Sequence, residues 1–326
     1  MQAALTRVLH AATLLPLLWP NSAAVAFSAF VTNEKGNSIT VIDTERMEAT
    51  TTFAVGKRPR GVALSPDGTR LYICASDDNV IQIFDTASHA LVGRIPTSDP
   101  EQAALSPDGS RLYVANEDDN LVSIIDTQLR KSVAEIPVGV EPEGVAVSPD
   151  GKTIVVTSET TNMAHFIDVA ARKTTGNVLV GARPRFAQFK PDGSELWVSS
   201  EVGGSVAVID PAQRRVTGKI EFDIPGVTKE QAQPVGIRMT ADGRTAFVAL
   251  GPANRVAVVD TATKKVERYL LVGQRVWQLA LTPDDKRLLA VNGVTNDVSV
   301  IDVAARKVLK SIQVGALPWG VAVAPK

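Results

Sequence analysis

The stretch Pro59–Thr86, PRGVALSPDGTRLYICASDDNVIQIFDT, sets the pattern for the rest of the chain. It holds three short apolar runs, which are separated by the turn-forming sequence Pro66-Asp67-Gly68 and by the polar segment SDDN. The turn sequence recurs as PDG at 107–109, 149–151 and 191–193, and in weaker form at 241–243 and 283–285. An aspartate ends the third run in every copy, at Asp43, Asp85, Asp126, Asp168, Asp210, Asp260 and Asp302.

The copies follow one another at a nearly constant period. Five of the six steps between the repeated aspartates are 41 or 42 residues long, and the remaining step is 50. A period of about 40–45 residues, with four short strands in each copy, is typical of a β-propeller blade. The repeated aspartates are interpreted as turn formers, because an aspartate carboxylate accepts hydrogen bonds from backbone amides two residues on.

The two ends of the chain complete one repeat between them. Phe27–Asp43 begins in the middle of a repeat, and the missing first strand appears at the other end as Trp319–Pro325. An open stack of blades would leave unpaired strand edges and one uncovered apolar face. We therefore predict that residues 27–326 form an all-β fold, a seven-bladed β-propeller of four-stranded antiparallel blades. The C-terminal strand is expected to complete the N-terminal blade.

Residues 1–26 lie outside the repeats and have the order of a secretory signal peptide. Arg7 precedes a short apolar run, Val8–Trp19, and a small-residue segment then ends in Ala24-Val25-Ala26. The run is shorter than the roughly 20 apolar residues of a membrane-spanning helix. No later segment is apolar enough to span a bilayer. We expect cleavage after Ala26 and an exported, soluble product; a disordered leader is the alternative.

The composition argues against some classes of partner. A net charge of −1 gives no reason to expect nucleic acid or an anionic membrane surface. Cys74 is the only cysteine, so the chain forms no intramolecular disulfide. The other repeats place small residues in the same slot, and we therefore expect Cys74 to be a small buried hydrophobe.

One position of the second strand carries a large apolar residue in most copies. We expect these residues to pack between neighbouring blades. They are Phe30, Tyr72, Tyr113, Val155, Trp197, Phe247 and Leu289.

The repeats resemble a known family of propellers. They read like LYVANEDDNLVSIID at Leu112–Asp126, which is similar to the YVTN-type repeat family. The seven-repeat organisation, the signal peptide and the segment EFDIPGVTKEQAQPVGI at Glu221–Ile237 resemble a narrower group, the PQQ-dependent catabolism-associated β-propeller proteins. This resemblance implies a periplasmic bacterial protein that accompanies quinoprotein alcohol oxidation and transport. Its partner would be a quinoprotein dehydrogenase, a cytochrome or a transport component. It supplies no catalytic residues.

The motifs of several cofactor sites are absent from the sequence. It contains no CxxCH haem site, no Walker phosphate loop and no GxGxxG. Catalytic quinoprotein alcohol dehydrogenases are longer propellers with repeated tryptophan-docking motifs, so the sequence does not support PQQ binding and we assign no cofactor. His89 and His165 are interpreted as isolated histidines, and no metal site is predicted.

Departures from the repeat concentrate in the loops that enter the first strands. The slot just before the GVAL-type run holds Arg60, Glu101, Glu143, Arg185, Val235, Trp277 and Trp319. Two residues earlier the chain has Arg58, Asp99, Glu141, Arg183, Gln233, Arg275 and Leu317. The loops between the second and third strands add Glu34, Glu117, Glu159 and Glu201. We expect all of these residues to ring the mouth of the central channel on one face.

This mouth is the predicted binding site. The residues assigned to it are Arg58, Arg60, Glu101, Glu141, Glu143, Arg183, Arg185, Arg275, Trp277 and Trp319. An exposed tryptophan beside arginine is a usual composition of a binding hot spot. The alternative is a solvated polar rim in which tryptophan plugs a narrow channel, because loops favour charged residues in any case.

The 50-residue step inserts extra residues between Ile220 and Gly236. A lengthened loop on a rigid scaffold often carries recognition. We assign a recognition loop with Phe222, Ile224, Pro225 and Lys229; the alternative is a tolerated surface insertion.

The function predicted from the sequence is non-catalytic binding or docking through the mouth face, and no catalytic residue is assigned. The first alternative is a propeller subunit of a periplasmic dehydrogenase complex, resembling an amine dehydrogenase heavy chain, which would make the chain part of an enzyme. A second alternative is a surface or scaffold module.

Overall fold

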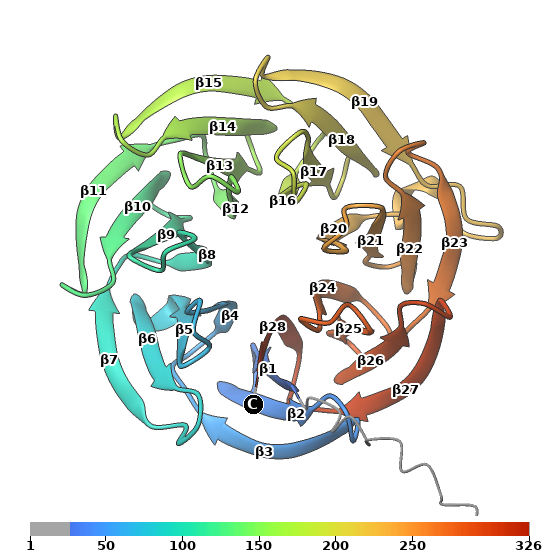
Figure 1. Cartoon of the computed structure of the whole chain (residues 1–326), viewed down its shortest axis with the longest axis horizontal. Helices are drawn as coiled ribbons and strands as arrows, with labels where there is room; N and C mark the ends of the chain where they lie inside the picture. The colour runs from blue at the N-terminus through green and yellow to red at the C-terminus, as the bar shows by residue number, and fades with distance from the viewer. Residues whose placement is uncertain (1–26, 326) are drawn as a thin grey trace, which may run out of the picture.

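The computed structural model describes residues 27–325, which form seven four-stranded antiparallel sheets arranged around a central axis (Figure 1). Blade 1 consists of β28 (Pro318–Pro325), β1 (Phe27–Asn33), β2 (Ser38–Asp43) and β3 (Glu48–Ala54). Blade 2 consists of β4 (Pro59–Leu64), β5 (Arg70–Ala75), β6 (Val80–Asp85) and β7 (Leu91–Pro96). Blade 3 consists of β8 (Pro100–Leu105), β9 (Arg111–Asn116), β10 (Leu121–Asp126) and β11 (Lys131–Pro137). Blade 4 consists of β12 (Pro142–Val147), β13 (Thr153–Ser158), β14 (Met163–Asp168) and β15 (Lys173–Leu179).

Blade 5 consists of β16 (Pro184–Phe189), β17 (Leu196–Ser200), β18 (Ser205–Asp210) and β19 (Arg215–Glu221). Blade 6 consists of β20 (Pro234–Met239), β21 (Thr245–Leu250), β22 (Arg255–Asp260) and β23 (Val266–Leu271). Blade 7 consists of β24 (Val276–Leu281), β25 (Arg287–Asn292), β26 (Asp297–Asp302) and β27 (Lys307–Gln313). Two single-turn 3₁₀ helices, η1 (Ser76–Asp78) and η2 (Lys229–Gln231), interrupt loops. The predicted seven-bladed propeller is confirmed.

The last strand of the chain closes the ring. β28 pairs antiparallel with β1, with Phe27 opposite Pro325 and Phe30 opposite Ala322. Figure 1 shows the two ends of the described chain side by side within blade 1. The predicted completion of the N-terminal blade by the C-terminal strand is therefore confirmed.

The strand-ending aspartates form the turns expected of them. In Asp126, for example, Oδ1 accepts hydrogen bonds from the backbone N–H groups of Gln128 (3.0 Å) and Leu129 (2.8 Å). Equivalent backbone bonds are made by Asp43, Asp85, Asp168, Asp210, Asp260 and Asp302. These carboxylates therefore stabilise the turn between the third and fourth strands.

The core consists of apolar layers between adjacent blades. Trp197 of β17 packs in one cluster with Ile237 and Val248 of blade 6, and Phe30 of β1 packs with Leu71 of blade 2. The other members of the predicted set also lie in clusters that join two blades. The predicted packing between blades is confirmed.

A second set of contacts links the blades from the turns between third and fourth strands. One residue of each turn has a positive φ and reaches back to the preceding blade. The ring of His89 stacks on Phe53 with centroids 4.9 Å apart, and the guanidinium of Arg130 donates to the carbonyl of Val92 at 2.9 Å. The other five turn residues with positive φ that contact the preceding blade are Met47, Arg172, Arg214, Lys264 and Arg306.

The inner strands approach closely around the axis. The residue after the slot is glycine in β4, β12, β20 and β28, whereas β8, β16 and β24 carry Gln102, Phe186 and Gln278 there. A Cβ at Gly144 would lie 2.8 Å from the carbonyl oxygen of Arg185 on the next strand. Each of the three larger residues has a glycine on both neighbouring inner strands, which makes room for its side chain.

Three sequence predictions concern residues away from the channel. The predicted signal peptide falls on residues 1–26, which lie outside the described part of the chain. No helix within residues 27–325 is long and apolar enough to cross a membrane. Cys74 is a free, buried thiol whose pKa is raised well above its ordinary value by burial, as expected of a small core residue.

Candidate functional site

The loops at the channel mouth are held by a repeated asparagine. Its Oδ1 accepts the backbone N–H of the residue two before the slot, as in Asn37 with Arg58 (3.1 Å) and Asn120 with Glu141 (3.0 Å). The equivalent asparagines, Asn79, Asn162, Asn254 and Asn296, accept the backbone N–H groups of Asp99, Arg183, Arg275 and Leu317 in turn. All six of these capped residues have positive φ. The caps therefore fix where the charged side chains of the mouth begin.

One half of the mouth is an ion-pair cluster around Glu101. The guanidinium groups of Arg60 and Arg58 both bond the Glu101 carboxylate, the latter at 2.6 Å. Glu34 of blade 1 lies 3.6 Å from each of the same two arginines. The side chain of Glu101 is fully buried. Residues that are distant in sequence are thus brought together as predicted.

The other half is a cluster around Arg185. Its guanidinium bonds Glu159 and lies 3.6 Å from Glu143 and 3.5 Å from Glu201. Arg275 adds a 2.6 Å bond to Glu201. Arg183 adds a 2.7 Å bond to Glu159. Arg60 lies 3.9 Å from Glu143, so the two halves form one network.

Both mouth tryptophans stack against these arginines. The Trp319 ring lies 5.0 Å from the Arg60 guanidinium carbon, and the Trp277 ring lies 4.2 Å from that of Arg275. Trp277 is half-buried, but Trp319 is only 1% exposed. The expectation of an exposed tryptophan is therefore wrong for Trp319, whose ring is buried with the Arg60 guanidinium of the adjacent blade over it.

Burial and charge act against each other in this network. Burial alone would lower the pKa of Arg60, but Glu143, Glu101 and Glu34 outweigh it and raise that pKa. Burial raises the pKa of Glu101 well above its ordinary value, and Glu143 adds to this effect against Arg60 and Arg58. The neighbouring carboxylates therefore keep Arg60 charged, whereas burial works against the charged form of Glu101.

Three carboxylates of this region lie close enough to share a cation. Oxygen atoms of Asp99, Glu101 and Glu117 lie within 4.8 Å of one another. Burial, followed by the charges of Glu117 and Asp118, raises the pKa of Asp99. Arg58 already bonds Glu101 and lies 3.5 Å from Asp99, so its guanidinium supplies positive charge there. We assign no metal to this cluster.

The lengthened loop lies at the outer edge of the disc. Figure 1 shows it running out past β23 before it returns to β20. Phe222 and Ile224 are buried in the core shared by blades 5 and 6, whereas Pro225 and Lys229 are exposed. The two apolar residues therefore anchor the loop, and only the exposed pair is available for the predicted recognition.

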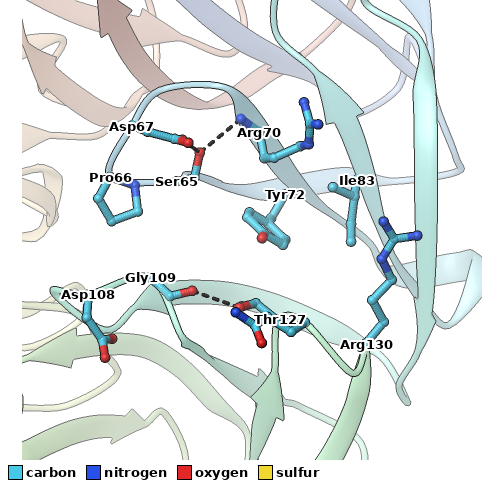
Figure 2. Close-up of a pocket in the computed structure, with 11 residues that line it drawn as sticks. Ser65, Pro66, Asp67, Arg70, Tyr72, Ile83, Asp108, Gly109, Thr127 and Arg130 are labelled. Atoms are coloured by element: carbon cyan, nitrogen blue, oxygen red, sulfur yellow. Dashed lines mark hydrogen bonds between the residues drawn. The ribbon is translucent and has the colours of Figure 1, made fainter.

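A groove between blades 2 and 3 opens on the opposite face (Figure 2). It has a volume of about 360 Å³. Its walls include Tyr72, Arg130 and the PDG turns of both blades. A cavity of the same volume lies between blades 4 and 5, at the turns that contain Pro149 and Gly193. Because the hollow recurs where the turns recur, we interpret it as part of the architecture.

The two histidines that the sequence left isolated have structural partners. His89 stacks on Phe53 as described, and His165 Nε2 accepts the backbone N–H of Gly139 at 3.0 Å. Its Nδ1 lies 2.8 Å from Asn177 Oδ1, and burial lowers its pKa. The two rings belong to blades 2 and 4 and do not form a common site.

Sequence reasoning missed the residues beneath the mouth. Gln102, Phe186, Arg238 and Gln278 face a cavity inside the channel together with Trp319. The signal that could have found them is a second departure from the repeat, because these inner-strand positions are glycine or alanine in most other blades.

Two family models match the chain. The model described as "Choice-of-anchor I domain" matches residues 118–292. The model described as "Lactonase, 7-bladed beta-propeller" matches residues 23–138. No curated protein matches the chain at a significant level.

Solved structures of similar shape come from several proteins. Hydrazine synthase from Kuenenia stuttgartiensis is 24% identical with a TM-score of 0.77, over 84% of this chain and 92% of that chain. A candidate 6-phosphogluconolactonase from Bacteroides uniformis is 18% identical with a TM-score of 0.78, over 92% and 99%. The dihydro-heme d1 dehydrogenase NirN is 15% identical with a TM-score of 0.70, over 94% and 77%. At these identities the likeness shows the propeller fold alone.

Proposed function

The chain belongs to the choice-of-anchor I domain family, and from that premise we propose that it is a non-catalytic docking propeller whose mouth face binds a protein partner. It is exported to the periplasm and accompanies quinoprotein-dependent alcohol oxidation and the associated transport. The partner is a quinoprotein dehydrogenase, a cytochrome or a transport component. The resemblance of the repeats and of the segment Glu221–Ile237 supports this setting.

One observation carries the docking role: acidic residues, four of them exposed and without an ion pair in the described part of the chain, gather on the mouth-face loops of blades 2 to 4. This acidic rim comprises Asp77, Asp78, Asp99, Glu117, Asp118, Asp119 and Glu141. Asp77, Asp78, Asp118 and Asp119 are exposed, and within residues 27–325 none of these four forms an ion pair. Uncompensated surface charge of one sign steers and selects a partner of the opposite sign. The proposed partner therefore presents a basic surface.

The buried ion-pair network supports the rim from below. Arg58 and Arg60 form ion pairs with Glu101 and Glu34. They therefore do not neutralise the exposed aspartates of the acidic rim. A rigid, internally paired floor with free charges at its edge can receive a partner without refolding.

The test is affinity capture from the periplasm of cells grown on an alcohol. The wild-type chain is compared with the double variant Asp118→Asn, Asp119→Asn, which keeps side-chain size and removes two exposed charges. We expect the variant to retain less partner, and the wild-type complex to weaken as salt rises toward physiological strength. A captured redox-active small subunit would select the dehydrogenase-subunit alternative.

The matched control removes two exposed carboxylates elsewhere. Glu45 lies in a turn of the opposite face, and Glu135 lies on outer strand β11. The double variant Glu45→Gln, Glu135→Gln should capture the partner as the wild type does. Equal capture by all three proteins would overturn the docking assignment.

A further inference from the structure

The central channel contains a cavity below the mouth. Its volume is about 160 Å³, and residues of all seven inner strands line it. Trp319 belongs to the mouth slot, whereas Gln278 and Arg238 lie one and three positions further along their strands. Most of the remaining wall is glycine, alanine and valine. A water molecule occupies about 30 Å³ of liquid, so the cavity has room for a ligand of a few heavy atoms.

Several buried polar atoms of this wall have no hydrogen-bond partner. The side-chain Nε2 and Oε1 of Gln278 both lack a partner, although Gln278 is only 3% exposed. The indole Nε1 of Trp319 is also unpartnered. Buried polar groups in native proteins are almost always satisfied, by protein, water or a bound ion. Two donor atoms, Gln278 Nε2 and Trp319 Nε1, and one acceptor atom, Gln278 Oε1, are therefore left without a protein partner in two residues that line the cavity.

Arg238 brings a positive charge to the cavity without a counter-ion. Its guanidinium carbon lies 4.8 Å from the centre of the Phe186 ring, and one N–H bonds the carbonyl of Ile237 at 2.7 Å. Among the described residues, no carboxylate lies within ion-pair distance of it. Burial lowers its pKa to about 10, so it is still protonated at neutral pH. The arginines of the mouth, in contrast, are all ion-paired.

The charge at this position is specific to blade 6. Five other blades have alanine at the equivalent position, namely Ala63, Ala104, Ala146, Ala280 and Ala322. The repeat therefore folds without an arginine here, and packing does not explain it.

We propose that the cavity binds one small monovalent oxoanion, either an organic carboxylate or an inorganic ion such as nitrate. The Arg238 guanidinium neutralises the charge, since its planar donors match the oxygens of such ions. The indole N–H of Trp319 and the amide of Gln278 donate the remaining hydrogen bonds. A divalent anion is disfavoured, because the cavity holds a single unpaired cation. This site is separate from the proposed docking surface and does not depend on it.

The test is a titration of the full chain with sodium acetate and with sodium nitrate in a low-salt zwitterionic buffer. Within residues 27–325, tryptophan fluorescence reports on Trp197, Trp277 and Trp319, of which only Trp319 lines the cavity, and the thermal midpoint reports on binding to the native state. We expect saturable binding of at least one of the two ions and a raised midpoint. Acetate alone would assign the site to carboxylates, and nitrate alone to inorganic ions. Sodium sulfate at matched ionic strength should bind more weakly.

The decisive variant is Arg238→Ala, which installs the residue that five other blades already use. Its affinity for the bound anion should fall about tenfold or more, as expected when a charged hydrogen-bond donor is removed. In anion-free buffer its midpoint should exceed that of the wild type, because a half-buried charge without a counter-ion is lost. Gln278→Met provides a second variant that should also weaken binding.

Arg244→Ala is the matched control, because Arg244 is an exposed arginine whose side chain is 86% accessible. Its affinity should remain that of the wild type. The proposal is overturned if neither acetate nor nitrate binds saturably to the wild-type chain. It is also overturned if Arg238→Ala binds the anion as the wild type does. If only Gln278→Met folds, wild-type binding by that variant overturns the proposal.

Discussion

Gly144 of β12 lies where two inner strands approach closely. A Cβ there would lie 2.8 Å from the carbonyl oxygen of Arg185 and 3.0 Å from the Cα of Phe186, which are backbone atoms that cannot rotate away. Gly218 of β19 offers a contrast, since the nearest atom to its added Cβ would be 3.8 Å away. Both glycines lie in strands, so they differ in the room available for a side chain and not in secondary structure.

We expect Gly144→Ala to lower the free energy of unfolding by about 1–3 kcal/mol, the usual range for overpacking a tight site. Gly218→Ala should leave it unchanged or raise it by up to about 1 kcal/mol, because alanine restricts the unfolded chain. Urea unfolding followed by circular dichroism measures both values. A Gly144→Ala protein as stable as the Gly218→Ala protein would contradict the crowding of the inner strands.

Single residues could be predicted from the sequence where they repeat. The turn aspartates and the inter-blade apolar residues were identified correctly because each appears once per period. The burial of Trp319 and the unpaired charge of Arg238 could not be, because they depend on how side chains from different blades meet across the axis. Periodicity specifies which positions face the channel but not how far each side chain reaches.

At the scale of elements, the loop between β19 and β20 departs most from the repeat. Elsewhere an asparagine caps the loop, but blade 5 has Gly204 at this position, with a φ of 61°. The carbonyl oxygens of Ala232 and Lys229 would lie 3.4 and 3.6 Å from an added Cβ. The loop and the glycine therefore belong together: the η2 turn occupies the space that the capping side chain fills in other blades.

We expect Phe222→Ala to destabilise the protein by about 3–5 kcal/mol, as for other buried phenylalanine truncations. Pro225→Ala and Lys229→Ala should each change stability by less than about 0.5 kcal/mol, because both residues are exposed. Thermal and urea unfolding of the three variants test this difference. A Phe222→Ala protein with wild-type stability would show that the loop is not anchored in the core.

The length of the insertion was enough to locate this loop in the sequence. It did not show which of the loop residues face the core. An insertion of mixed polarity is compatible with a projecting recognition loop and with a packed one. Only the contacts of Phe222 and Ile224 with blades 5 and 6 show which residues of it are used for packing.

At the scale of the whole molecule, the fold was predictable because both halves of blade 1 are visible in the sequence as parts of one repeat. β28 contributes Val321 and Ala324 to the cores that blade 1 shares with blades 7 and 2. The backbone N–H of Gly320 also donates to Thr32 Oγ1 at 2.8 Å. Closure therefore brings the first and last inner strands together and completes both the mouth and the cavity.

The most direct measurement is the urea unfolding curve of a chain that starts at Phe27 and lacks residues 318–326. We predict that this truncation abolishes the single cooperative transition, because it opens the ring and exposes the edge of β1. The control moves residues 314–325 ahead of Phe27; since Pro325 lies opposite Phe27, a short turn can join them and restore the transition. A truncated chain with the midpoint and slope of the full chain would contradict the closed ring.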